Sequence, residues 1–241
     1  MKSFTINTLA SSNLFALTVV ALGVTLLFTP RAGHTQEMQR GVSVQMPVTS
    51  NAASVPDADQ NDAWVVAVTA DGSLYFGVDP MTREALADWM KTHPRNREAK
   101  LYVKADARAS FSAVEKVLAV AREDLFQDAV LLTSKAQSPE PGTVVSPQGL
   151  EVLIGPPLPT GVVATVVQLL DSGKQPPALK INNDQVPWSA VQNTLQQHFQ
   201  KGDEKVILLK ADRQIPFASV ARAIDICRST GAKVMISTPD L

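Results

Sequence analysis

The stretch Lys104-Ala105-Asp106-Ala107-Arg108-Ala109-Ser110-Phe111 decides the fold, because its pattern returns 106 positions later as Lys210-Ala211-Asp212-Arg213-Gln214-Ile215-Pro216-Phe217. In both places an apolar run precedes the Lys-Ala-Asp string, and an apolar helix face that includes Val114 or Val220 follows it. A unit of strand, acidic turn and amphipathic helix is therefore present twice. This repetition predicts two copies of one small domain within the 241 residues of the chain.

Hydrophobic periodicity predicts the same order of elements in both copies, which we place at residues 62–135 and 161–241. The first copy is expected to contain strands at 64–69, 74–78, 101–105 and 129–133, with helices at 81–92 and after Ser110 or Ser112. The second copy is expected to contain strands at 162–170, 178–181, 206–209 and 234–237, with helices through Trp188 to Phe199 and from Pro216. We therefore expect an α+β fold in which each copy is a small mixed sheet with two helices on one face.

Two segments of different composition precede the copies. Residues 31–61 have few large apolar side chains and are expected to form a tether, whereas residues 136–160 are rich in proline and are expected to form a stiff linker. Each segment contains a short alternating stretch that is typical of a strand, and each stretch ends in proline, at Pro47 and Pro156. The segment that leads into each copy is thus duplicated as well.

The N-terminus carries an uncharged stretch from Ser3 to Pro30, and residues 9–28 are long and apolar enough for a membrane-spanning helix. We assign residues 1–30 to a cytoplasmic tip and this helix, with the residues after Pro30 outside the cytoplasm. The alternative is a cleaved signal peptide. It is less favoured because Arg31-Ala32-Gly33-His34-Thr35 offers no good cleavage site of small residues.

Composition argues against several functions. The 23 acidic and 22 basic residues nearly cancel, so no field of one sign favours nucleic acid. The single cysteine, Cys227, is expected to be a small core residue, and His93 and His198 have no metal-ligating neighbours at suitable spacing. No catalytic constellation and no phosphate-binding glycine loop is recognisable, so we expect no enzyme activity, no cofactor and no metal site.

The second copy contains an apolar strand that ends in Ala-Asp, an aromatic residue, an apolar helix face, a glycine and a closing strand. These features are the run Val206–Asp212, then Phe217, Val220, Ile224, Asp225, Gly231, Val234, Ile236 and Thr238-Pro239. In this order of features the copy resembles the periplasmic domain of the ExbD/TolR family of biopolymer transport proteins. Together with the N-terminal apolar segment and the stretch ending at Pro47, the resemblance spans most of the chain and implies a tandem duplication of the family's domain.

The resemblance implies an accessory subunit of an energy-transducing complex in the cell inner membrane. The expected protein is single-pass, with both C-terminal domains in the periplasm beside an ExbB/TolQ-like membrane protein. Its other expected partners are a TonB/TolA-like protein or peptidoglycan, and its two copies are expected to pair with each other or to form a homodimer. The alternative is a periplasmic binding or scaffold module that is not coupled to ion flow.

Three residues are candidate functional positions. In the family an aspartate in the membrane helix is the ion-coupling residue, and here Asn13 follows Ile6-Asn7 at that place. A carboxamide cannot bind and release a proton at physiological pH, so coupling through Asn13 is doubtful. Asp106 and Asp212 are possible partner contacts, although turn formation and helix entry explain an aspartate at such a position as well.

Overall fold

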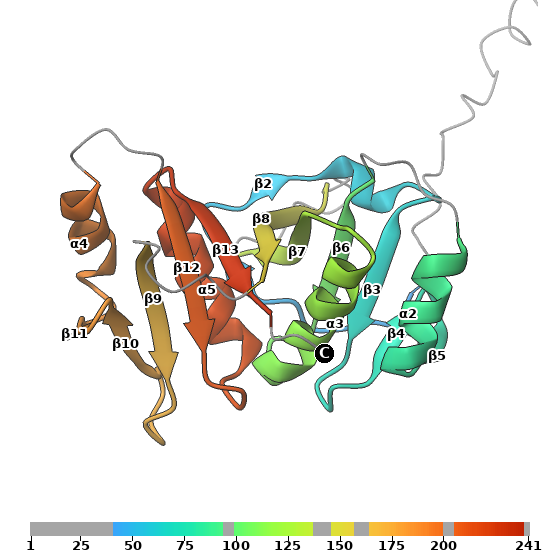
Figure 1. Ribbon diagram of the computed structural model, residues 1–241, viewed down its shortest axis with the longest axis horizontal. Coiled ribbons are helices and arrows are strands. Elements are labelled where there is room, and N and C mark those ends of the chain that lie inside the picture. Colours follow the sequence, from blue (N-terminus) through green and yellow to red (C-terminus); the bar gives the residue numbers. More distant parts are fainter. Residues whose placement is uncertain (1–40, 94–98, 137–145, 157–163, 200–204, 239–241) are drawn as a thin grey trace, which may run out of the picture. The chain divides into compact units, whose positions relative to one another are not determined.

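The computed structural model describes residues 41–93, 99–136, 146–156, 164–199 and 205–238 (Figure 1). The expected membrane helix and Asn13 lie outside these residues. Within the described residues, no helix is long and apolar enough to cross a membrane. The described residues all belong to one compact unit.

The first copy contains the expected elements in the expected order, together with a short strand at residues 79–81 that was not expected. Its strands and helices are β3 (Trp64–Val68), β4 (Leu74–Phe76), β5 (Asp79–Met81), α2 (Arg83–Thr92), β6 (Leu101–Ala105), α3 (Phe111–Glu123) and β7 (Asp128–Lys135). Thr82 caps α2, because its side-chain hydroxyl accepts a hydrogen bond from the backbone N–H of Ala85.

The second copy repeats this order. Its elements are β9 (Thr165–Leu170), β10 (Ala178–Ile181), β11 (Asp184–Gln185), α4 (Val191–His198), β12 (Val206–Ala211), α5 (Phe217–Ser229) and β13 (Lys233–Ser237). Trp188 was expected on the apolar face of the first helix of this copy, but α4 begins only at Val191. The indole of Trp188 instead donates to the carbonyl of Pro177 at 2.8 Å and lies 4.9 Å beneath the Arg222 guanidinium.

The two copies share one sheet instead of forming two separate sheets. In the described residues the strand order is β11-β10-β9-β12-β13-β8-β7-β6-β3-β4-β5, and β8 is Gln148–Gly155. Figure 1 shows β8 between β13 of the second copy and β7 of the first. On either side of β8, equivalent strands of the two copies follow in the same order. Short hairpin strands therefore form both outer edges of the sheet.

Strand β8 comes from the segment expected to be a linker, and it joins the copies. Residues 148–153 pair antiparallel with β7, and residues 153–155 pair parallel with β13. The alternating sequence of this segment gives it a buried apolar face, with Leu150 and Val152 in the core. The proline-rich composition therefore did not prevent a central strand from forming in the part of the linker without proline.

The helices lie on one face of the sheet and bury one continuous core. Helix α2 packs on α3, α4 packs on α5, and α3 contacts α5 across the two copies. The core between these helices and the sheet includes Phe111 and Phe217, which occupy equivalent positions in the two copies.

The segment expected to be a tether also packs against the fold. It forms β1 (Val48–Thr49), β2 (Ala53–Ser54) and the 3-10 helix η1 (Pro56–Asp59). Strand β1 pairs with the end of β7, and β2 pairs with the start of β8. Ala58 of η1 covers the other face of the sheet, where it packs with Tyr102, Val130 and Leu132. Residues 41–63, which we call the approach segment, are therefore part of the folded unit.

Candidate functional site

The loops that follow the two Lys-Ala-Asp strings contact each other. Each loop supplies backbone carbonyls that accept hydrogen bonds from the first N–H groups of the other copy's helix. The backbone N–H of Phe111 donates to the carbonyl of Ile215 at 2.9 Å, and the N–H of Phe217 donates to the carbonyl of Ala109 at 2.8 Å. Because residues 109 and 215 are equivalent in the two copies, the two bonds are related by an approximate two-fold axis. The bridge between Ser110 and Pro216 lies on this axis.

A second pair of bonds follows the same symmetry. The N–H of Ser112 donates to the carbonyl of Arg213 at 3.1 Å, and the N–H of Ala218 donates to the carbonyl of Ala107 at 2.9 Å. The first N–H groups of a helix have no partner within it, so each copy here supplies acceptors for the other. The hydroxyl of Ser110 lies 3.0 Å from that of Ser112, and Ser110 makes no side-chain capping bond to α3.

Asp106 is a buried carboxylate at the end of β6, with 3% of its surface exposed. Its Oδ1 accepts from Nε of Arg108 at 2.9 Å and from the Arg108 backbone N–H at 3.0 Å. Its Oδ2 accepts from Nη2 of Arg108 at 3.0 Å and from the backbone N–H of Gln45 at 3.1 Å. Asp106 therefore forms the expected turn and also attaches the approach segment to the first copy.

The surroundings of Asp106 hold its pKa well below its usual range. The Arg108 side chain contributes most, and the backbone N–H groups of Arg108 and Gln45 add to it against the opposing effect of burial. A carboxyl group whose pKa is lower in the folded state than in the unfolded chain stabilises the fold at pH values above its unfolded pKa, which is about 3.9. This stabilisation is lost as the pH falls below that value toward the folded pKa.

We therefore expect the stability difference between the natural chain and Asp106→Asn to be largest near neutral pH and to shrink below about pH 4. Urea unfolding at pH 7, 4 and 3 measures this difference. Curves for the two proteins that stay equally far apart at all three pH values would contradict the assigned role of Asp106.

Asp212 occupies the equivalent position in the second copy but is exposed. Its Oδ2 accepts from the backbone N–H of Asp171 at 2.8 Å. Gln214 stands where the first copy has Arg108, so the paired guanidinium is missing at this position. The two aspartates thus have different surroundings despite their matching sequence.

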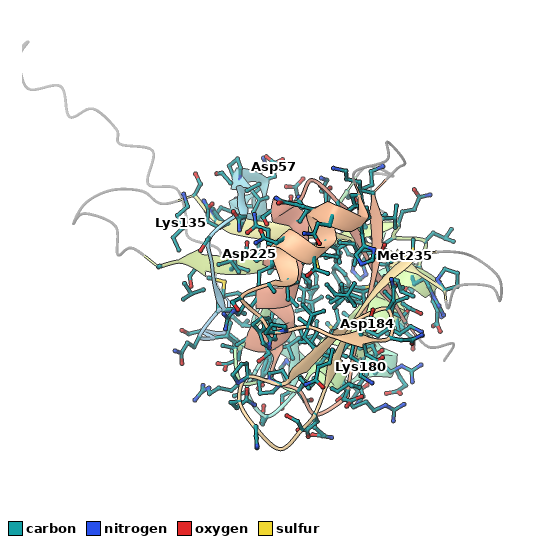
Figure 2. The ribbon with its side chains drawn as sticks, turned by 90° about the vertical axis from the view of Figure 1, so that its left-hand side faces the viewer. Asp57, Lys135, Lys180, Asp184, Asp225 and Met235 are labelled. Carbon is teal, nitrogen blue, oxygen red and sulfur yellow. The ribbon has the colours of Figure 1, made fainter. Side chains whose placement is uncertain are left out.

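Asp225 is a second buried carboxylate that binds the approach segment, and it lies on α5 in the second copy (Figure 2). Its Oδ2 accepts from the backbone N–H of Ser50 at 3.0 Å and from Nδ2 of Asn51 at 3.2 Å. Its Oδ1 accepts from the backbone N–H of Asn51 at 2.8 Å. The approach segment is therefore bound to the first copy through Asp106 and to the second copy through Asp225.

The sequence reasoning did not assign these contacts to Gln45, Arg108 or Asp225. A signal for Asp225 existed, because it is an acidic residue beside the buried positions Ile224 and Cys227 of an apolar helix. Such a residue requires hydrogen-bond donors when it is buried. No comparable signal pointed to Gln45, whose contact uses only its backbone.

The other polar and aromatic residues considered from the sequence lie either in the packed core or on the surface of the fold. Cys227 is fully buried, and burial raises the pKa of its thiol to about 12. Trp89 packs with Trp64 and Phe76, and exposed His93 stacks on it with ring centroids 4.1 Å apart. His198 is exposed at the end of α4. Across the described part of the chain, no cluster of three or more His, Cys, Asp or Glu residues is arranged to hold a metal ion.

The comparisons with known proteins agree with the duplicated architecture. The family model for the biopolymer transport protein ExbD/TolR matches residues 6–136 and again residues 135–240. No curated protein and no solved structure matches the chain. Each of the two matches contains one approach stretch and one copy of the strand and helix unit, and together they cover nearly the whole sequence. The chain therefore belongs to the ExbD/TolR family of biopolymer transport proteins, with the family's domain present twice.

Proposed function

We propose that this protein is an accessory subunit of an ExbB/TolQ-type energy-transducing transport complex. Residues 9–28 would anchor it in the inner membrane as a single pass, and the two copies would lie in the periplasm. Family membership of both halves of the chain supports the transport role. The uncharged N-terminal stretch supports the anchor.

The observation that carries the proposal is the symmetric contact between the two Lys-Ala-Asp loops. Symmetric exchange of backbone bonds between equivalent loops is typical of a two-fold dimer. Here both halves of that contact come from one chain. We infer that one chain supplies the complex with a pair of domains but with only one membrane helix.

We propose further that this subunit lacks its own proton-carrying carboxylate, because Asn13 stands at the family's ion-coupling position. Polar side chains in membrane helices usually face protein partners, so Asn13 would keep a contact with the channel subunit without carrying a proton. The partner on the periplasmic side would be a TonB/TolA-like protein or peptidoglycan. Of the two candidate contact residues, Asp212 is the better one, because it is exposed whereas Asp106 is bound within the chain.

The second candidate function is a periplasmic binding or scaffold module without a link to ion flow, and Asn13 is the observation that favours it. The two functions differ in whether the chain associates with a channel subunit. Co-purification of the full chain with the cognate ExbB/TolQ-like protein is expected under the first function. Absence of that association would leave the scaffold function as the better account.

The substitution Asn13→Asp tests the proposed loss of the proton carrier. In vesicles that contain the channel subunit, we expect the variant to raise proton leak above that of the natural chain, because a carboxyl group can bind and release a proton. Asn13→Gln is the matched control and should leave the leak unchanged. Equal leak for the Asp and Gln variants would contradict the assignment of Asn13 to the ion-coupling position.

The anchor can be tested separately. Extraction of membranes with alkaline carbonate should leave the protein in the membrane fraction, with an N-terminal sequence that precedes Pro30. A soluble protein whose sequence begins after Pro30 would show that the N-terminal segment is a cleaved signal peptide.

A further inference from the structure

The second copy has a pocket of about 320 Å³ at its contact with the first copy. Its lining from the second copy includes the end of β12 at residues 209–211 and Arg213. Phe111 and Glu115 of α3 line it from the first copy. Residues of both copies therefore surround the pocket, and its volume is at the lower end of the range usual for small-molecule sites, about 300–1,000 Å³.

The lining combines apolar residues with charged ones. The apolar residues are Phe111, Leu209 and Ala211. The charged residues are one acid, Glu115, and two bases, Lys210 and Arg213. Because the acid belongs to the first copy and both bases belong to the second, opposite charges lie on the two sides of the pocket.

The acid and the bases of the pocket do not satisfy each other. In the part of the chain that the structure describes, the Glu115 carboxylate and the Arg213 guanidinium form neither an ion pair nor a hydrogen bond with each other. Burial raises the pKa of Glu115, and the attraction of Arg213 opposes this only in part. A partly buried carboxylate without a donor costs free energy, and a ligand that supplies the donor recovers it.

The first copy lacks both of these charges at the equivalent positions. Ala221 of α5 corresponds to Glu115, and Ala107 corresponds to Arg213. The backbone N–H of Ala107 donates to the carbonyl of Gln45 at 2.7 Å, so the approach segment lies against this position in the first copy. The pocket of the second copy has no residue of the approach segment in its lining. The opposite charges are therefore found where the chain leaves the space open.

The residues of the pocket match one class of small molecule. A guanidinium binds a carboxylate through two parallel N–H donors, and a carboxylate binds an ammonium group through a charge-assisted hydrogen bond. Phe111 and Leu209 offer apolar surface on which an apolar group of a ligand is removed from water. A carboxylate, an ammonium group and an apolar side chain in one small molecule define an apolar amino acid.

We propose that this pocket binds a free apolar amino acid, with the ligand carboxylate on Arg213 and the ligand ammonium group on Glu115. The ligand would connect the two copies, because its two charged groups bind residues of different copies. Binding of this kind goes beyond the proposed transport role and does not depend on it, since it requires only the pairing of the copies.

The probe is L-leucine, and two molecules of similar shape separate its two charges. The compound 4-methylpentanoate has the carboxylate without the ammonium group, and 3-methylbutylamine has the ammonium group without the carboxylate. Titration calorimetry of the full-length protein should show saturable binding of leucine. Each single-charge compound should bind at least about ten-fold more weakly, because it leaves one charged group of the pocket without a partner.

Two substitutions in the protein assign the contacts. Glu115→Gln and Arg213→Gln should each weaken leucine binding about ten-fold. Only Arg213→Gln should also weaken binding of 4-methylpentanoate, because that compound has no group for Glu115. The urea midpoint of Glu115→Gln should stay unchanged or rise, so that lost binding is not lost folding. Glu84→Gln and Lys180→Gln are the matched controls outside the pocket lining and should not alter binding.

A leucine analogue that carries a photoreactive diazirine locates the site. After irradiation, mass spectrometry should find crosslinks near Phe111 on α3 and within residues 209–213. An excess of leucine should suppress these crosslinks.

Four results would overturn the proposal. They are the absence of saturable leucine binding, equal affinities for leucine and either single-charge compound, leucine affinity unaffected by either pocket substitution, and crosslinks confined to other parts of the chain. None of these results would affect co-purification with the channel subunit, so failure of this proposal is distinguishable from failure of the proposed function.

Discussion

Replacing Gly149 by alanine should lower the free energy of unfolding by about 1–3 kcal/mol, the usual cost of forcing extra volume into a packed site. A Cβ atom at this position would lie 2.3 Å from Cγ1 of Val130 and 3.2 Å from Cγ2 of Val55. Val130 is β-branched and 1% exposed, so its side chain has little freedom to move away. Urea unfolding of the full chain measures the effect.

Gly155→Ala is the matched control, because Gly155 lies in the same strand, β8. A Cβ there would meet Sδ of Met235 at 2.8 Å, but the methionine side chain is flexible and only half-buried. We expect the Gly155 variant to lose clearly less stability than the Gly149 variant. Equal effects would mean that the close packing of β8 on β7 does not carry the stability assigned to it.

Asp225→Ala should cost about 3 kcal/mol, because it removes the charge-assisted hydrogen bonds that a buried carboxylate accepts from backbone N–H donors of the approach segment. The donors are the backbone N–H groups of Ser50 and Asn51. Hydrogen exchange should therefore accelerate at these two amides more than in the helix that carries residue 225. This local effect distinguishes a detached approach segment from general destabilisation.

Asp57→Ala is the control for Asp225→Ala. Asp57 is an acidic residue of the approach segment itself, but its hydrogen bond with the Gln60 side chain is exposed. We expect a change within about 0.5 kcal/mol, as for most surface substitutions. A stability loss as large as that of Asp225→Ala would contradict the importance assigned to burial of the carboxylate.

Much of the fold could be predicted from the sequence because local patterns determined it. The periodicity around residues 101–105 and 178–181 predicted β6 and β10 with their observed bounds, and the order of elements in both copies agrees with the structure. The α+β class follows from that order. The resemblance to the ExbD/TolR family, based on the run Val206–Asp212 and on the helix and strand residues that follow it, is confirmed by the matches to both halves.

The arrangement of the two copies was harder to predict because it depends on pairing between distant segments. Strand β8 has the alternating pattern of a strand, but the surrounding prolines suggested a linker. Nothing local indicates that one strand pairs antiparallel with β7 and parallel with β13. Likewise, residues 45–59 are poor in large side chains, and their attachment depends on Asp106 and Asp225, which are far away in sequence.

The two candidate contact residues illustrate the same limit. Asp106 and Asp212 occupy identical positions in the repeat, so both were expected to have the same candidate role. Of these two aspartates, the approach segment contacts Asp106 and not Asp212, so Asp106 is buried while Asp212 is exposed. The difference arises from the path of residues 41–63 and not from the repeat itself.

The central claim, that the two copies form one intramolecular pair, is tested most directly by cutting the full chain between them. A protease recognition sequence inserted after Pro141 separates the first copy from β8 and the second copy. After cleavage, we predict that the two fragments co-elute on size exclusion at the size of the uncut chain, held by the β7–β8 pairing and the mutually capped loops. Fragments that separate under native conditions would contradict the account.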